Sequence, residues 1–352
     1  ELVGGGNARS ESIGEALGDS SVGVFDHAFG GDGSVGGAGG NARSSAFGRN
    51  AGSQGVEVSA EAVGGAGGDL GIGHPGVQRG GNGGGAQLGM VYGASTSGDV
   101  RAIGSATGGS GGDGDPQTGR PGGGGASVLL ENTGDGGPSG GPYPGQHAFC
   151  GRAADYSAGA HGLTSSRLEV SKSAQALEIV SIAGGAFDAE SRASAENASG
   201  GLTVRAESLG GSGRFAFMGD AERGGRANTL AQGESSGDGH AVVVAPRNVR
   251  GFSAQGGLGA DAAGGGAGGD GGDAFSVSQG TALGDSPVTV EDRVMGGDGG
   301  HGSGAAGAPG IGGGAFSFAT GVALGTSAGH VLSAGLGGPG GRGGEFTHSW
   351  TQ

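Results

Sequence analysis

The 352-residue chain has few of the side chains that build an ordinary protein core or an active site. Aromatic residues make up 5% of it, and it holds a single cysteine, Cys150, and a single lysine, Lys172. One cysteine excludes a disulfide framework within the chain. The sequence lacks a run of 18 apolar residues, which argues against a helical membrane span. It does not begin with methionine, so we expect that a targeting segment was removed or that the ends were trimmed.

Sequence motifs of catalysis and nucleotide binding are missing as well. A phosphate loop needs a lysine directly after its glycines, whereas Lys172 stands in VSKSA. The GGSGG around Ser110 has the letters of a nucleophile elbow but lies inside a glycine run. Matches to GxGxxG arise by chance at this glycine content, and none has a strand and a helix around it. We therefore expect that the protein is not an enzyme, with no catalytic residue and no cofactor.

The charged and metal-binding residue types are spread thinly. The net charge of −15, from 33 acidic and 18 basic residues, disfavours nucleic acid as a partner. The histidines are scattered without HxH, HxxxH or HExxH spacing, which indicates loop positions rather than metal ligands: His27, His74, His147, His161, His240, His301, His330 and His348.

Three weak calcium candidates end the motif GGxGGD: Asp69, Asp113 and Asp270. They match the first letters of the calcium-binding repeat GGxGxDxUx. The aliphatic residue expected two places after each aspartate is missing, and so is the nine-residue spacing. We therefore expect solvated aspartates and no metal site.

What the chain does have is glycine, 98 residues of it, in a periodic arrangement. In residues 304–318 glycine falls at every third place and is followed by an apolar–polar alternation. Period three predicts an extended helix with three residues per turn, polyglycine II, in which only glycine fits beside a crowded neighbour. Alternation predicts a β-strand. This junction recurs, which predicts an all-β elongated repeat, either a β-solenoid or stacked β-hairpins, with interleaved polyglycine-II helices.

The repeat shows in the first strand of each unit, which starts on an alanine after glycines. These alanines are Ala8, Ala42, Ala86, Ala126, Ala186, Ala227, Ala274 and Ala315, at steps of 34, 44, 40, 60, 41, 47 and 41 residues. The step of 60 predicts either an insertion or a further copy that begins near Ala148. A second alternating strand is expected after a short turn, at residues 56–62, 100–103, 168–170, 202–206, 241–244 and 288–291. A hairpin would make the sheet antiparallel and a solenoid corner would make it parallel, and alternation fits both.

Composition divides the chain into three regions. We expect glycine-rich β repeats in 1–147, sheet-richer central repeats in 148–250, and glycine-rich β repeats with an unpaired C-terminal strand in 251–352.

The GGxGG runs followed by Asn or Asp resemble those of glycine-rich bacterial surface and secreted repeat proteins, including the mycobacterial PE-family arrays. The period-three runs also resemble the polyglycine-II bundles of springtail antifreeze proteins and some phage tail-fibre tips. The chain differs in having no PE-type helical domain, no disulfide pair and no threonine-rich array. The resemblance implies a location outside the cell or at its surface.

Together these patterns predict a structural, self-assembling subunit of an extracellular filament, sheath or matrix. The alternative is a binding module, a tip adhesin or an ice-binding protein with a patterned polyglycine-II surface, which could have a cell-surface or matrix partner. For assembly we expect a homopolymer formed by strand addition. The tail strand with Phe346, His348 and Trp350 on one side would join the first unit of the next copy. In the alternative arrangement, the tail folds back and caps its own last sheet.

Overall fold

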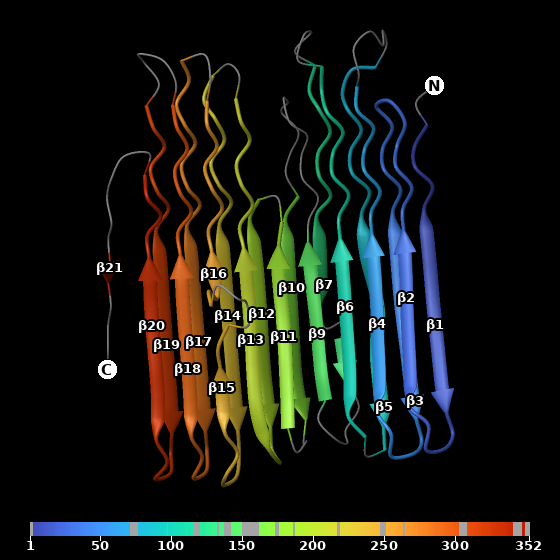
Figure 1. Ribbon diagram of the computed structural model, residues 1–352, viewed down its shortest axis with the longest axis vertical. Helices are drawn as coiled ribbons and strands as arrows, with labels where there is room; N and C mark the ends of the chain where they lie inside the picture. Colours follow the sequence, from blue (N-terminus) through green and yellow to red (C-terminus); the bar gives the residue numbers. More distant parts are fainter. Residues whose placement is uncertain are drawn as a thin grey trace.

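The computed structural model describes residues 3–70, 77–96, 98–115, 120–131, 134–136, 142–149, 162–172, 176–185, 187–216, 219–246, 251–262, 265–302, 308–340 and 347–348. All regular structure in these residues is β, with no helix. The strands form two faces, and the chain alternates between them (Figure 1).

In the part of the chain that the structure describes, the first face has ten strands, in two sheets of four and six. They are β1 (Ala8–Ala16), β3 (Ala42–Asn50), β5 (Ala86–Ser95), β7 (Val128–Glu131), β8 (Gly134–Gly136), β10 (Thr164–Lys172), β12 (Ala189–Asn197), β14 (Ala227–Ser235), β17 (Ala274–Ala282) and β19 (Ala315–Ala323). The second face, over the same described residues, is one sheet of eleven strands. They are β2 (Val22–Phe29), β4 (Val56–Val63), β6 (Val100–Thr107), β9 (Pro142–Phe149), β11 (Ala176–Gly184), β13 (Gly201–Leu209), β15 (Val242–Val244), β16 (Ala254–Gln255), β18 (Val288–Met295), β20 (Gly329–Leu336) and β21 (Thr347–His348).

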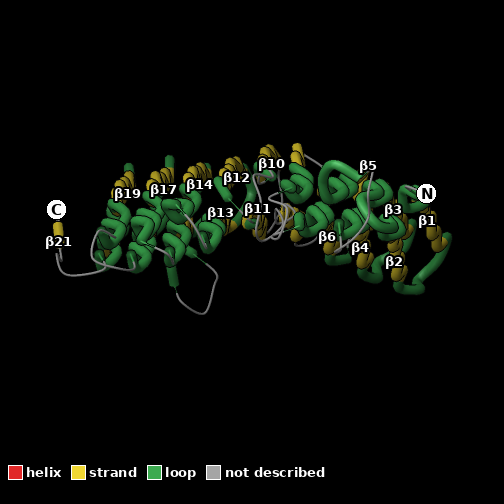
Figure 2. The backbone as a smooth tube through the Cα atoms, turned by 90° about the horizontal axis from the view of Figure 1, so that it is seen from above, coloured by secondary structure: helices red, strands yellow, loops and turns green. Residues whose placement is uncertain are grey.

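The two strands of a unit face each other across the core, and hydrogen bonding joins each strand to the next unit (Figure 2). Within the described residues, every ladder between units is parallel, and β20 and β21 are the one pair of strands that is antiparallel. A hairpin would have paired the two strands of one unit directly. The turns are therefore corners, and the architecture is β-solenoid-like.

Six of the predicted first-strand alanines are paired with one another in exact register: Ala8 with Ala42, Ala42 with Ala86, Ala227 with Ala274, and Ala274 with Ala315. Ala227 also pairs with Ala189 of the preceding unit. Ala189 rather than Ala186 begins its strand, and Ala186 lies outside the described residues. Val128 begins the fourth unit instead of Ala126, because Val128 lies in register with Thr164 of the next unit.

The long step in the repeat contains an extra unit, β10 and β11. It begins at Thr164 and not near Ala148, which lies in the second-face strand β9. Residues 168–170 were predicted as a second strand but belong to the first-face strand β10. Both strands of the extra unit alternate and neither starts on an alanine after glycines, so alternation alone did not separate first from second strands.

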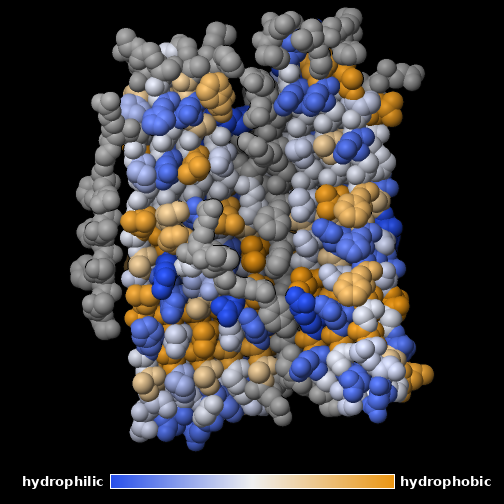
Figure 3. Space-filling view, in the orientation of Figure 1, coloured by the Kyte–Doolittle hydropathy of each residue, from blue (hydrophilic) through white to orange (hydrophobic). Residues whose placement is uncertain are grey.

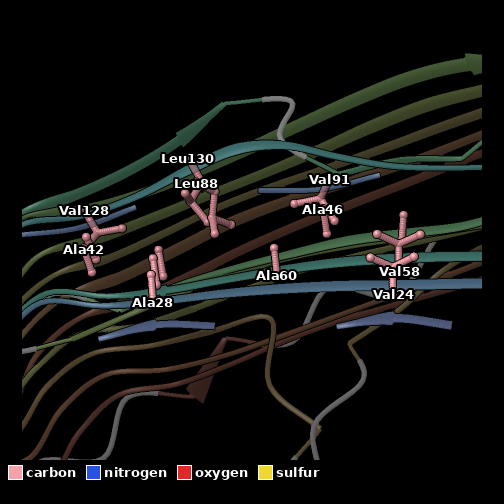
Figure 4. Close-up of a cluster of buried hydrophobic side chains, with 14 of the residues drawn as sticks. Val24, Ala28, Ala42, Ala46, Val58, Ala60, Leu88, Val91, Val128 and Leu130 are labelled. Atoms are coloured by element: carbon pink, nitrogen blue, oxygen red, sulfur yellow. The ribbon is translucent and has the colours of Figure 1, made fainter. Parts of the chain in front are cut away.

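The core between the faces is made of small side chains that interdigitate. Ala42, Ala46 and Leu88 point inward from the first face, and Ala28, Val58 and Ala60 point inward from the second face (Figure 4). All six are less than 10% exposed. The seventh residue of many first-face strands is glycine and faces a valine: Gly14, Gly48, Gly233, Gly280 and Gly321. Gly93, the eighth residue of β5, does the same after a register shift between β3 and β5. A small residue opposite a β-branched one keeps the two sheets close and leaves few voids.

Glycine segments continue both faces beyond the strands (Figure 1). In the triplet Gly296, Gly297 and Asp298, a Cβ on the first glycine would overlap the carbonyl of Gly313, and one on the second would overlap that of Gly257. The third residue is exposed, and the following triplet repeats this arrangement. Backbone hydrogen bonds join the segments, for example from Gly297 N–H to Gly272 O at 2.9 Å. Each segment therefore contacts neighbours on two sides with a period of three residues.

Candidate functional site

A set of buried and half-buried polar side chains, here called the polar seam, lies between the two faces. It comprises the third residue of seven first-face strands, which is serine or threonine, together with the inward polar residues opposite; in β5 and β7 the third residue is leucine. On the first face these third residues are Ser10, Ser44, Ser166, Ser191, Thr229, Ser276 and Ser317. On the second face the inward polar residues are Asp26, Ser181, Ser208, Asp292 and Ser333. In the middle of the seam, hydroxyl groups of the two faces form hydrogen bonds with each other. The Ser166 and Ser181 oxygens lie 2.8 Å apart, and those of Ser208 and Thr229 lie 2.6 Å apart.

Asp26 is a carboxylate at one end of the polar seam and is 1% exposed. It accepts hydrogen bonds from Ser10 at 2.7 Å and Ser12 at 2.8 Å, and a short one from Ser44. Burial by itself raises the pKa of Asp26, but the hydrogen bonds from Ser44, Ser10 and Ser12 outweigh it and hold the pKa below the ordinary 3.8. The carboxylate is thus kept charged inside the core by hydroxyl donors.

Asp292 holds the equivalent place near the other end and is fully buried. Ser276 at 2.6 Å and Ser278 at 3.0 Å donate to its Oδ1, and Ser317 at 2.6 Å donates to its Oδ2. The backbone N–H of Phe318 donates to Oδ2 as well, at 3.2 Å. Both carboxylates therefore join serines from two successive units, which ties those units together.

Sequence reasoning missed these two aspartates, although a signal was present. In residues 22–29 the inward positions are Val22, Val24, Asp26 and Ala28, so the aspartate falls in the apolar phase of an alternating strand. Such a residue must find hydrogen-bond donors across the core. The serines that serve it are in phase on the facing strand.

Two of the three calcium candidates accept hydrogen bonds between units. Asp69 Oδ1 accepts the N–H of Asp113 at 2.7 Å, and Asp270 Oδ1 accepts that of Ile311 at 2.9 Å. The same contact, from an aspartate to a backbone N–H one repeat later, recurs through the glycine segments: Asp32 to Ala66, Asp188 to Arg226, Asp220 to Ala267, Asp261 to His301 and Asp273 to Gly314. These aspartates satisfy backbone donors of the next unit.

No group of three histidine, cysteine, aspartate or glutamate side chains suited to a metal lies within the described ranges. His27 contacts Glu61, at 3.0 Å between Nδ1 and Oε2 on the exposed second face, and His240 Nδ1 lies 2.6 Å from the carbonyl of Ser236. Cys150 lies outside the residues that the structure describes. In the parts of the chain with known placement, no helix has the length and apolar character to cross a membrane.

The ends of the faces are the remaining candidate site. Among the described residues β1 pairs only with β3, and β19 only with β17, so each has a free outer edge. β20 pairs on its outer side with β21 over two residues, Gly335 with His348 and Leu336 with Thr347. We expected the tail strand to be unpaired within its own chain, and this ladder differs from that expectation. Open backbone groups of β20 lie close by in the same chain, so the short ladder forms there. Phe346 and Trp350 lie outside the described residues.

The outer surface of the second face mixes polar and apolar side chains (Figure 3). Arg101 and Glu57 form an ion pair at 2.7 Å there, and Phe25 and Phe29 are each 59% exposed. The chain matches no protein-family model, no curated protein and no solved structure. The function is therefore inferred from the fold and its geometry.

Proposed function

We propose that this protein is a structural, self-assembling subunit of an extracellular filament, sheath or matrix, and that it forms a homopolymer by strand addition. One observation carries the proposal: in the described residues, the stack of parallel strands on the first face ends on both sides in a free edge of the same repeat, at β1 and at β19. An edge strand presents backbone donors and acceptors that a further strand can pair. Contact between two different ends is heterologous and generates a fibre when it does not close.

The test is assembly of the purified protein at increasing concentration, followed by sedimentation and electron microscopy. We expect polymers whose amount rises steeply above a threshold concentration. A monodisperse subunit at all concentrations would contradict the proposal.

We propose further that the glycine segments are polyglycine-II helices. The period-three contacts of residues 296–301 support this assignment, as do hydrogen bonds between segments such as Gly65 N–H to Gly40 O at 2.9 Å. Amide hydrogen exchange tests it. The N–H groups of Gly65 and Gly272 should be protected as strongly as those of the strands, whereas flexible linkers would exchange within seconds.

The alternative function is a binding module, a tip adhesin or an ice-binding protein. The third residues of the glycine triplets favour it, because they are exposed at regular spacing, as at Asp298 and His301. A monodisperse protein that binds an ice surface or a cell-surface ligand would support this function in place of assembly.

A further inference from the structure

The first and last strands of the first face are built alike. The inward residues are Ala8, Ser10, Ser12, Gly14 and Ala16 in β1, and Ala315, Ser317, Ala319, Gly321 and Ala323 in β19. All ten are half-buried, whereas most equivalent residues of the inner strands β14 and β17 are buried. At each end, a column of side chains is thus partly exposed to solvent, and another unit would cover it.

In the glycine segment before β1, Gly6 is likewise left uncovered on one side. It stands two residues before its strand, as Gly40, Gly84 and Gly313 do before theirs. A Cβ on any of those three would overlap a carbonyl of the preceding unit, and for Gly40 that carbonyl is the one of Gly6. A Cβ on Gly6 itself would meet nothing within 4 Å. Gly6 therefore has the residue type that a preceding unit requires, but within the described residues that unit is missing.

The end strands of the second face complement each other as well. If the register of β18 and β20 continues, Ser333 falls beside Asp26, and a hydroxyl meets the carboxylate of the polar seam. On the outer surface the same register places Leu332 beside Phe25 and Leu336 beside Phe29. Phe25 and Phe29 are 59% exposed and Leu336 is 44% exposed, so pairing would cover apolar surface.

We propose that β19 and β20 of one copy pair in parallel with β1 and β2 of the next copy, with Ala315 opposite Ala8 and Gly329 opposite Val22. This inference rests on the proposed assembly and specifies its contact. The strands then continue from copy to copy with the spacing of the internal units, and the polar seam continues from Ser317 and Ser333 to Ser10 and Asp26.

Two features set the limits of this contact. Val3 occupies a place where the inner units have Gly37, Gly81 and Gly310, so the contact comprises the strands and the first glycine triplet. The ladder of β21 lies on the β20 edge at Gly335 and Leu336, so the tail leaves that edge when copies stack.

The first experiment compares Gly6→Ala with Gly201→Ala. Both positions accept a Cβ within one chain, since the nearest atom to a Cβ on Gly201 is the Ala241 carbonyl oxygen at 3.6 Å, and Gly201 lies in a central strand. We expect unchanged melting temperatures for both variants. Gly6→Ala should raise the concentration needed for polymerisation at least about tenfold through the new clash, and Gly201→Ala should polymerise as the parent does. Normal polymerisation of Gly6→Ala would overturn the proposal.

The second experiment fixes the register by cross-linking. In a Cys150→Ser background, Ile13→Cys and Thr320→Cys would face each other on the outer surface in the proposed register, and Ile13→Cys with Val322→Cys would be two residues out of register. A short bifunctional thiol reagent should yield covalent oligomers from the first pair at several times the rate of the second. Polymers that cross-link equally in both pairs, or in neither, would overturn this register while the proposed function stands. Absence of any polymer would contradict the proposed function itself.

Deletion of residues 345–352 separates edge pairing from addition of the tail strand. Removal of the competing ladder should leave polymerisation as fast as before or faster. Loss of polymerisation in the folded, truncated chain would assign the contact to the tail and overturn pairing of β19 and β20 with the next copy.

Discussion

The strands and the glycine segments of each unit fill the space between neighbouring elements in different ways. In the strands, side chains fill the space between the faces, as Val58 does opposite Gly48. In the glycine segments backbone meets backbone, and a Cβ on Gly310 would overlap the carbonyl of Gly269. A side chain can be trimmed or can rotate, but a carbonyl is fixed by its own hydrogen bonds. We therefore expect a substitution in the strands to cost less stability than a substitution at a packed glycine of the glycine segments.

The largest expected effect comes from Gly310→Val. Its side chain would have to displace a hydrogen-bonded backbone, which we expect to cost on the order of 4 kcal/mol. The neighbouring Ile311 is 68% exposed, so Ile311→Val should change stability by less than about 0.5 kcal/mol. Urea unfolding of the two variants measures the difference. Equal effects would mean that the glycine segment does not pack as described.

Removal of a seam carboxylate should have the next largest effect. Asp26→Ala leaves the hydroxyls of Ser10, Ser12 and Ser44 without their acceptor in the core, at a cost of about 3 kcal/mol. Asp292→Ala should behave in the same way at the other end. Thermal melting of both variants at neutral pH checks this, and a loss below about 1 kcal/mol would show that water satisfies the serines.

The pH dependence follows from the lowered pKa of Asp26. A carboxyl whose pKa is lower folded than unfolded stabilises the protein above the unfolded value, and this contribution disappears as pH falls through the folded value. The stability advantage of the parent over Asp26→Asn should therefore be constant near neutrality and shrink below about pH 3.8. Paired denaturation curves from pH 6 to pH 2 measure it. An advantage that grows toward low pH would contradict the hydrogen-bond assignment.

A rescue experiment tests whether the strand core is adaptable. A Cβ on Gly48 would come within 2.6 Å of Val58 Cγ2, so Gly48→Ala should cost about 2 kcal/mol. Val58→Ala removes the obstructing methyl groups, and the double variant should recover part of that loss. A double-mutant cycle with no coupling energy would show that the strands are as rigid as the glycine segments.

Asp69→Ala should have a smaller effect, because it removes one hydrogen bond between units on an exposed surface. We expect a loss of about 1 kcal/mol, since water can replace the lost acceptor for the N–H of Asp113. Asp69→Asn keeps an acceptor oxygen and serves as the matched control. Equal losses in the two variants would indicate a role for the charge instead.

The smallest expected effect is that of a calcium chelator. The oxygens of Asp69 and Asp270 already accept backbone hydrogen bonds, so chelation should leave the melting temperature within experimental error. Binding to the folded state would raise stability by mass action. A large drop on chelation that only calcium restores would reveal a site at these aspartates.

Local pattern in the sequence predicted the β class, the alternation within strands and most of the repeat. Alanines such as Ala42 and Ala274 begin strands in register because each unit must present the same small residue to the same place in the core. Alternation has the same form on either face, however, so it placed residues 168–170 on the wrong one. The extra unit at Thr164 was missed for a related reason, because it lacks the glycine and alanine that mark the others.

The sequence by itself determined the two periods. Side chains of a strand alternate between its two sides, which gives a period of two residues. In a crowded glycine segment only glycine fits at fixed positions. Only the tertiary structure decided that the strands run parallel, because corner and hairpin use the same turn residues. It also decided which polar residues meet, since Asp26 and Ser44 lie on different faces in successive units and the distance between them depends on how the units stack. Contacts between units are set by register, and register is a property of the assembled sheets rather than of any one strand.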